Sequence, residues 1–269
     1  MISDEMSDYD RDFDVRSYIK LSYGDPHVSS ANFKKELRDF VLENVHEFYA
    51  ERAPTLRSNS ARILEFGGGP IIVYLISAVP YASSIVFSDY SSSCRKAVRE
   101  WINDGPDAYD WHPYFDYVIK TFENDESAET PLNRAKEMKS KISSIIHCDV
   151  AMENPIGKGY EKSFDVISVS FCFESACKSV EDVEETLKKL ATLLRPGGWI
   201  RINGVLGGSY YTVNDKRFFN VTQTKESVRN ALAKAGFASI DVKAHVSDCP
   251  AHADYLGMYH ASAQLSDRT

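Results

Sequence analysis

The chain alternates between short apolar runs of strand composition and longer segments of helical periodicity. Runs rich in β-branched and aromatic residues, bounded by polar or turn-forming residues, occur at 62–66, 84–88, 144–148, 164–171, 198–204, 238–246 and 256–264. Segments in which apolar residues recur every three or four positions lie between most of these runs, at 91–102, 180–194 and 225–235. This alternation predicts an α/β fold, with a largely parallel seven-stranded sheet and helices on both faces. No helical segment separates the last two runs, so we expect an antiparallel C-terminal hairpin at one edge of the sheet.

Two further segments can be interpreted from their ends and their composition. The predicted helix from Val180 carries acidic residues in its first turns and basic residues later, and the sequence RPGG at 195–198 ends it. We therefore expect the next strand to begin at Trp199. The stretch 104–143 is too long for an ordinary connection, and its aromatic content argues against a disordered linker. It predicts an inserted helical segment packed beside the functional site.

Length and charge narrow the class of protein. At 269 residues, 43% hydrophobic and 26% charged, the chain is long enough and apolar enough for one α/β domain with insertions. A net charge of −8 without a Lys/Arg run makes nucleic acid an unsuitable partner. The longest apolar stretch, near 71–79, is far shorter than the roughly 20 residues that span a bilayer, and the acidic N-terminus is no signal peptide. We expect a cytosolic protein that does not contact membranes.

The cysteines and histidines do not indicate a metal site. No C-x-x-C motif occurs among the five cysteines, Cys94, Cys148, Cys172, Cys177 and Cys249. Free cysteine is readily buried, so we expect reduced thiols, most of them in the interior. The nearest approach to a metal pair is His252 with Asp254, which lacks further ligands, and no bound metal is expected.

Three consecutive glycines, at 67–69, follow the first predicted strand. A glycine turn from a strand into a helix lets the backbone approach a ligand closely. The dinucleotide-binding pattern requires glycine at the sixth position of such a turn, where this chain has Ile72, and Pro70 interrupts the turn. A phosphate-binding loop would need Gly-Lys-Ser/Thr, which is absent. The loop therefore suits a ligand that needs close backbone contact without a phosphate.

Acidic residues lie at the ends of the first three predicted strands. Glu65 would repel a phosphate and attract a cation. Asp89 is placed to accept hydrogen bonds from both ribose hydroxyls of a nucleoside, and Asp149 suits an adenine amino group. S-adenosylmethionine matches this set because it carries a sulfonium and an ammonium but no phosphate. The alternative is a turn of glycines with solvated acids that bind no ligand.

These residues and several others resemble the nicotinamide, phenylethanolamine and indolethylamine N-methyltransferases, a class I S-adenosylmethionine-dependent family. The likeness covers nearly the whole chain in family order and is carried by RSYIKLSYGD, LEFGGGP, VFSDYS, DAYDWHPY, IIHCDV, FCFESAC, LLRPGG and GSYY. It implies one Rossmann-like methyltransferase domain over 1–269. Within that domain it implies a helical N-terminal lid over 1–60 and inserted helices over 104–143.

The resemblance also implies roles for individual residues. Positions that match the family's cofactor site are Tyr9, Tyr18, Tyr23, Gly67, Gly68, Gly69, Asp89, Tyr90, Ser91, Cys94, Asp149, Val150 and Ser170. Positions that match its substrate site are Tyr18, Glu174, Gly204, Tyr210, Tyr211 and Asp254. On composition alone, the N-terminal tyrosines could instead be the buried aromatics of an amphipathic helix.

Several positions depart from the family's pattern. Val73 replaces a tyrosine at the methionine end, and Cys94 replaces an asparagine near the adenosine. Gly204 stands where the nicotinamide enzymes have an aspartate, which counts against nicotinamide as acceptor. Gly208 stands where the phenylethanolamine enzyme has an acid, so its catechol-type specificity need not follow.

The acids that do match indicate a reaction. Glu174 and Asp254 match acids that the phenylethanolamine enzyme has near its amine, and we expect them to act as catalytic residues. An aliphatic amine with a pKa near 10 must lose a proton before its nitrogen can attack a methyl group. We expect these two acids to accept that proton and Tyr210 and Tyr211 to form the pocket wall. The predicted partner is a small-molecule amine, and the predicted enzyme is a monomer.

Three alternatives stay open. A pyridine or thioether acceptor needs no general base. A relative that binds the cofactor without catalysis would use the same fold. Both acids could also be solvated surface residues, as most acids are.

Overall fold

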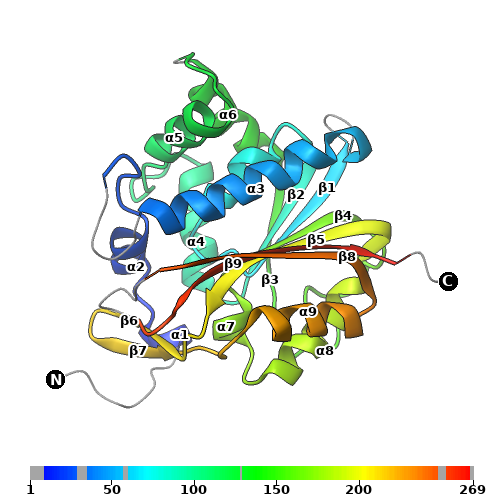
Figure 1. Cartoon of the computed structure of the whole chain (residues 1–269). Helices are drawn as coiled ribbons and strands as arrows, with labels where there is room; N and C mark the ends of the chain where they lie inside the picture. Colours follow the sequence, from blue (N-terminus) through cyan, green and yellow to red (C-terminus); the bar gives the residue numbers. More distant parts are fainter. Residues whose placement is uncertain (1–8, 29–34, 57–59, 128, 248–252, 267–269) are drawn as a thin grey trace.

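The central sheet has seven strands in the order β3-β2-β1-β4-β5-β9-β8 (Figure 1). The computed structural model describes residues 9–28, 35–56, 60–127, 129–247 and 253–266. The strands are β1 (Ala61–Phe66), β2 (Ala82–Asp89), β3 (Ile142–His147), β4 (Phe164–Ser170), β5 (Leu194–Leu206), β8 (Phe237–Val246) and β9 (Gly257–Leu265). The first five are parallel, and β9 pairs antiparallel with both β5 and β8. The predicted parallel sheet and its antiparallel C-terminal strand pair are thus confirmed.

The order of the strands determines where a ligand can bind. From β1 the chain continues to β2 and β3 on one side and returns to β4 and β5 on the other. Loops leaving β1 and β4 therefore diverge at their carboxyl ends, which opens the crevice in which doubly wound sheets bind ligands.

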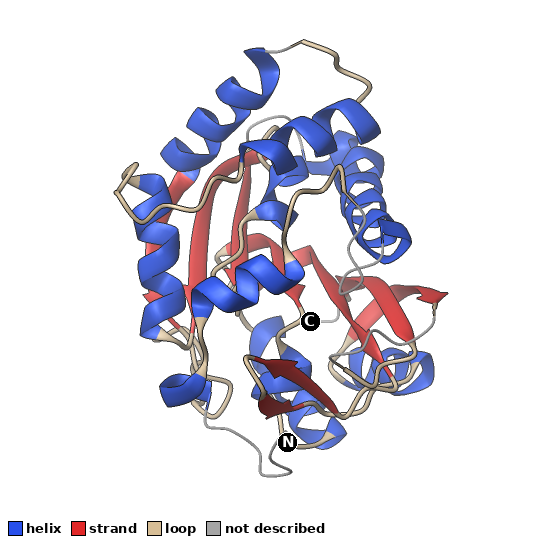
Figure 2. Ribbon diagram, turned by 90° about the vertical axis from the view of Figure 1, so that its left-hand side faces the viewer, coloured by secondary structure: helices blue, strands red, loops and turns tan. Residues whose placement is uncertain are grey.

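Helices cover both faces of the sheet (Figures 1 and 2). One face carries η1 (Val73–Ala78), α3 (Lys35–Leu56), α4 (Ser92–Ile102), α5 (His112–Phe122) and α6 (Glu129–Lys141), which share one apolar core. The other carries α7 (Phe173–Ala176), α8 (Val180–Ala191) and α9 (Lys225–Lys234), which share a second. The N-terminal segment adds α1 (Tyr9–Asp12) and α2 (Val15–Ser22). Within the described ranges, no helix is both long and apolar enough to cross a bilayer.

Two boundaries differ from the predictions. Helix α8 begins after the N-cap Ser179, as expected, but it ends at Ala191 rather than 194. Strand β5 begins at Leu194, which pairs with Phe164, so the segment RPGG belongs to the strand and not to the helix end. The reason is that the backbone N–H groups of Ser163 and Phe164 both bond to the carbonyl of Leu193, which draws the chain into the sheet early.

Other differences lie near the carboxyl edge of the sheet. The glycine turn leads into η1, a six-residue 3-10 helix that was not among the predicted helical segments. A separate two-stranded sheet, β6 (Tyr210–Val213) and β7 (Lys216–Phe219), was not predicted. Its turn is formed by Asn214 and Asp215, both with positive φ, 48° and 61°. Asn and Asp tolerate that conformation, so this dipeptide was the available signal for a hairpin.

Helices α5 and α6 lie within the segment 104–143, where inserted helices were predicted, and β3 already begins at Ile142. The aromatic residues of this segment face inward: Trp111, Phe115 and Tyr117 are buried. Helix α5 contacts both α3 and η1. The insertion therefore supports the helices beside the glycine loop.

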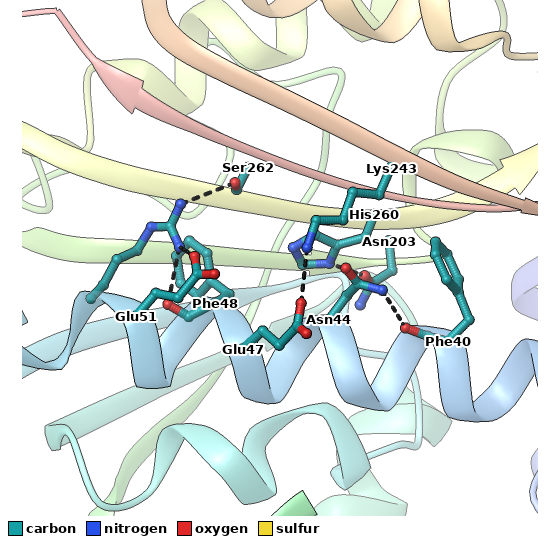
Figure 3. A network of polar contacts seen from close by, with 10 residues as sticks. Phe40, Asn44, Glu47, Phe48, Glu51, Asn203, Lys243, His260 and Ser262 are labelled. Carbon is teal, nitrogen blue, oxygen red and sulfur yellow. Dashed lines mark hydrogen bonds and ion pairs between the residues drawn. The ribbon is translucent and has the colours of Figure 1, made fainter.

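Beneath α3, the sheet presents polar side chains that are paired with one another or with the helix (Figure 3). His260 Nδ1 lies 2.8 Å from Asn203 Oδ1, and Lys243 Nζ lies 2.8 Å from a carboxylate oxygen of Glu47 on α3. Burial lowers the pKa of His260 well below its ordinary value. A neutral His260 and its partners act as a polar layer that fixes α3 on the sheet.

Candidate active site

A cavity of about 450 Å³ opens at the carboxyl ends of β1, β2 and β4. Its walls come from the glycine loop, the N-terminal helices, α7 and the β6–β7 hairpin. The predicted site residues that line it are Tyr9, Tyr18, Tyr23, Gly67, Gly68, Gly69, Asp89, Tyr90, Asp149, Val150, Ser170, Glu174 and Tyr211. Those that do not line it are Ser91, Cys94, Gly204, Tyr210 and Asp254. The structure thus brings most of the predicted residues, from distant parts of the chain, to one cavity.

The glycine loop needs bare backbone for two reasons. Gly67 and Gly69 have φ of +64° and +61°, a conformation that favours glycine. A Cβ on Gly68 would lie 2.5 Å from Phe87 Cζ and 2.9 Å from Glu65 Cγ. One on Gly67 would overlap the Cys172 thiol. A side chain at either position would therefore push the loop into the cavity.

Asp89 joins this loop to the end of β2. One carboxylate oxygen accepts a 2.7 Å bond from the Gly69 N–H, and the other accepts a 2.8 Å bond from the Ser91 N–H. Burial raises the pKa of Asp89, although these two bonds act in the opposite direction. A carboxylate has about four acceptor positions, so two remain for ligand hydroxyls. This fits the ribose of S-adenosylmethionine.

Ser91 and Cys94 lie behind that carboxylate rather than in the cavity wall. Ser91 is 1% exposed and starts α4 as its N-cap. The Cys94 thiol is buried and lies 3.9 Å from the Tyr9 hydroxyl. These two residues support Asp89 and Tyr9 instead of forming the surface of the cavity. Further along the edge, Tyr90, Asp149 and Val150 line it.

The N-terminal tyrosines close one side of the cavity. The Tyr23 hydroxyl lies 2.9 Å from the Tyr74 hydroxyl of η1, and the backbone carbonyl of Tyr23 accepts a bond from Tyr109. Tyr9 packs edge-on against Phe218 of β7 at a centroid distance of 6.1 Å. This segment therefore contacts both the glycine-loop side and the hairpin side of the cavity, as a lid would.

Glu174 is the most unusual group in the cavity wall. Its side chain is 2% exposed, and Oε1 accepts a 2.7 Å bond from the Val205 N–H. Oε2 is buried and has no hydrogen-bond partner among the described residues. Burial raises the pKa of Glu174 to about 7. A buried carboxylate oxygen without a donor is costly, so this oxygen is prepared for a donor from a ligand.

Asp254 does not join Glu174, contrary to the expectation. Its carboxylate accepts bonds of 2.7 and 2.5 Å from the Ser209 N–H and hydroxyl, and one of 3.1 Å from the Tyr210 N–H. Burial acts to raise the pKa of Asp254, but these bonds outweigh it and the pKa is lowered. Asp254 therefore anchors the turn before β6. Tyr210 lies outside the cavity lining as well, with the Arg217 guanidinium 4.1 Å from its ring centre.

Glu65 also differs from the expectation that it would attract a cationic ligand. It does not line the cavity, and its side chain is 2% exposed. Its Oε2 accepts a hydrogen bond from the Ser168 hydroxyl and lies 3.8 Å from Arg201 Nη2. The positive charge that Glu65 meets is thus a buried arginine of the protein itself.

Some lining residues were missed by the sequence analysis. Examples are Phe13, Ser175, Val205, Asn220 and Met258. Ser175 lies in the quoted stretch FCFESAC, next to Glu174, and was overlooked there, whereas the other four belong to no quoted motif. The β6–β7 hairpin and the loop after it, which contains Asn220, had not been placed. Among the described residues, no three His, Cys, Asp or Glu side chains are grouped to hold a metal; Cys249 and His252 lie outside those residues.

The sequence of this chain is similar to those of several known N-methyltransferases. Nicotinamide N-methyltransferase of Homo sapiens is 26% identical over 227 residues, which cover 84% of this chain and 82% of that protein. Phenylethanolamine N-methyltransferase of Macaca mulatta is 25% identical over 259 residues, 94% of this chain and 88% of that protein. Indolethylamine N-methyltransferase of Mus musculus is 26% identical over 229 residues, 85% and 83% of the two chains.

Solved structures share the fold. An S-adenosylmethionine-dependent methyltransferase from Methanosarcina mazei aligns with a TM-score of 0.54 at 11% identity, covering 79% of this chain and 96% of that one. A family model, described as NNMT/PNMT/TEMT family, matches residues 3–264. With the glycine loop, Asp89 and the N-terminal tyrosines around one cavity, this chain belongs to the NNMT/PNMT/TEMT family of S-adenosylmethionine-dependent methyltransferases.

Proposed function

We propose that this enzyme transfers a methyl group from S-adenosylmethionine to the nitrogen of a small-molecule amine, and that Glu174 receives the proton of that amine. The observation that carries the proposal is the Glu174 carboxylate. It is buried in the cavity wall, and its Oε2 accepts no hydrogen bond from any residue that the structure describes. An ammonium group supplies both the missing donor and the opposite charge.

The opposite side of the cavity suits the cofactor. The glycine loop would take the methionine end, Asp89 the ribose hydroxyls, and Asp149 with Val150 the adenine. Ser170 ends β4 beside the loop and also lines the cavity. S-adenosylmethionine supplies an electrophilic methyl group on a sulfonium. The chain's own residues must then bring a neutral nitrogen to that methyl group.

Glu174 can perform the proton step in two stages. In its ionised form it binds the incoming ammonium through Oε2 and then holds the proton that the nitrogen gives up. The freed lone pair forms the new N–C bond while the C–S bond breaks and its electron pair stays on sulfur. Catalysis consists mainly of holding the nitrogen about 3 Å from the methyl carbon, in line with the breaking bond. The faces of Tyr18 and Tyr211 attract the methylated cation, and the lid excludes water.

We also propose that the enzyme works as a monomeric single domain in the cytosol and without nucleic acid. Cys94, Cys148, Cys172 and Cys177 are free thiols, which suits a reducing compartment. The net charge of −8 opposes binding to a phosphate backbone.

A labelled-methyl assay tests the proposed reaction. The enzyme is incubated with methyl-labelled S-adenosylmethionine and a mixed library of amines, pyridines, thiols and thioethers, and the labelled product is identified. We expect label on amine nitrogen, with a large loss for Glu174→Gln and a smaller change for Asp254→Asn. Cofactor binding in calorimetry without label on any amine would contradict the proposal and favour a binding protein.

A further inference from the structure

Gly204 lies on β5 directly behind Glu174, in register with Tyr259 of β9. It is buried and does not line the cavity. A Cβ at this position would overlap Glu174 Oε1 and would lie 2.5 Å from Tyr259 Cε1 and 2.6 Å from Tyr259 Oη. Real Cβ atoms do not approach other atoms so closely. The glycine is therefore required by the carboxylate that rests against it.

Of the groups around Gly204, the Glu174 carboxylate is the one that can move, because it borders the cavity. Oε1 is fixed by the N–H of Val205, the residue after Gly204. The Glu174 carbonyl accepts a 2.7 Å bond from the Val221 N–H, which holds α7 in place. Tyr259 is fully buried, and its hydroxyl donates a 2.9 Å bond to Gln223. A side chain at 204 would displace Glu174 more readily than the packed ring.

We propose that Gly204 is a positioning residue that sets the enzyme's selectivity for cationic acceptors. Without a side chain at 204, the Glu174 carboxylate lies flat against β5, with Oε1 on the Val205 N–H and Oε2 unpaired for the acceptor. A side chain there pushes the carboxylate off that N–H and moves Oε2 away from the ammonium. This inference rests on the proposed function, and it concerns which acceptors the site prefers.

The proposal separates two classes of acceptor. An aliphatic amine arrives as a cation and depends on the place of the carboxylate. A pyridine nitrogen or a thioether sulfur attacks without losing a proton, so its rate depends much less on residue 204. Misplacing a reacting group by about 1 Å costs on the order of 100-fold in rate. We expect a side chain at residue 204 to lower the rate by about 100-fold for amines, and not for pyridines or thioethers.

A double-mutant cycle tests whether Gly204 acts through Glu174. The proteins are wild type, Gly204→Ala, Glu174→Ala and the double variant, assayed for kcat/KM with an amine and with a pyridine. We expect each single variant to lose about 100-fold for the amine, and the double variant to be no worse than Glu174→Ala. The proposal would be overturned if the two single losses in kcat/KM for the amine multiplied in the double variant, or if Gly204→Ala had the kcat/KM of wild type.

Gly105→Ala is a matched control. A Cβ at 105 would also overlap a glutamate carboxylate, that of Glu100, but neither residue lines the cavity. It should leave kcat/KM unchanged. Calorimetry should show S-adenosylmethionine binding within about threefold of wild type for every variant, since neither Gly204 nor Glu174 belongs to the glycine loop or the Asp89 region. A loss of amine turnover with lost cofactor binding would count against the proposal.

A second readout does not depend on turnover. The Val205 amide bonds to Glu174, so its NMR shift should follow the ionisation of that carboxylate in wild type and lose this dependence in Gly204→Ala. An amide that titrates identically in both proteins overturns the positioning role. If wild type methylates no amine, the proposed function fails while this result still stands. Should Gly204→Ala not fold, Glu174→Asp withdraws the carboxylate from Val205 instead, and an unchanged amide titration there would overturn the proposal.

Discussion

Glu65 and Glu174 are both fully buried glutamates, and burial raises the pKa of each to about 7. Their surroundings differ. Glu65 lies in the sheet with the Ser168 hydroxyl and the Arg201 guanidinium beside it. Glu174 lies in the cavity wall with one N–H and an unpaired oxygen. The comparison teaches that burial alone does not distinguish the two acids; the partners that surround each carboxylate do.

The region around Glu65 is organised to hold structure. Arg201 is fully buried, and its two terminal nitrogens donate to the Ser170 hydroxyl at 3.2 Å and to the Tyr74 carbonyl at 3.0 Å. It thus connects β5 to η1 and to the end of β4, both beside the cavity. The region around Glu174 offers no comparable cation among its hydrogen-bond partners, which leaves room for one from outside.

The largest effect should come from breaking the Glu65–Arg201 pair. Glu65→Gln leaves a buried guanidinium without its counter-charge, and the loss of one partner of a buried pair costs about 3–5 kcal/mol. The matched change Glu174→Gln removes no such partner and should cost less than about 1 kcal/mol. Urea unfolding at pH 8, where both carboxyls are ionised, measures the difference. Equal costs would show that the two regions do not differ in this way.

The pH dependence of stability should sharpen the comparison. The folded-state pKa of Glu174 is raised to about 7 from an ordinary 4.5, so the folded protein holds the proton more tightly. The resulting stabilisation is complete below about pH 4.5 and is lost as pH rises through 7, an effect of roughly 3 kcal/mol. Glu174→Gln should flatten this part of the curve. If the free energy of unfolding of wild type and of Glu174→Gln varied with pH in the same way from pH 5 to 8, this would speak against a neutral, buried Glu174.

Catalysis should depend on the unpaired acid. Glu174→Gln should lower kcat/KM for an amine by about 100-fold, equivalent to about 2.7 kcal/mol, because an amide cannot take the proton. The affinity for S-adenosylmethionine should remain within about threefold. Steady-state kinetics and calorimetry together check this. A loss that appears only in cofactor affinity would move Glu174 out of the acceptor site.

An exposed polar contact should matter least. Asn214, in the β6–β7 turn, donates bonds of 3.1 Å to Asp14 and 2.7 Å to Ser17, at the start of α2 in the proposed N-terminal lid. Asn214→Ala should weaken the closed lid by about 1 kcal/mol and speed the release of S-adenosylhomocysteine about fivefold. Stopped-flow displacement measures that rate. An unchanged rate would mean that these contacts do not limit opening of the lid.

The main features of the fold could be predicted because short stretches of sequence specify them. Seven apolar runs mark the seven strands, and the glycine loop and Asp89 occupy the ends of strands, where parallel strands place them at one edge. The β6–β7 hairpin was missed because its strands have four residues each, and the signal at Asn214 and Asp215 is a single dipeptide.

Site residues could be predicted where their place at the end of a strand was enough to bring them to the cavity. They could not be predicted where their partners come from distant segments. Glu65 was misread because its partners depend on register: Glu65 pairs with Ser168, and Ser168 pairs with Arg201. Asp254 was misread because a turn far away in sequence uses its carboxylate. Gly204 depends on a steric approach between β5 and α7. Contacts of this kind arise from packing between distant segments, and no local pattern specifies them.

The central claim, that Glu174 manages the proton of an amine acceptor, is tested most directly by the pH dependence of kcat/KM for that amine. In wild type, we predict that kcat/KM rises as pH passes through about 7, where Glu174 ionises. In Glu174→Gln that rise should disappear, leaving only the increase toward the amine's own pKa near 10. A rise through pH 7 that persists unchanged in Glu174→Gln would contradict the account.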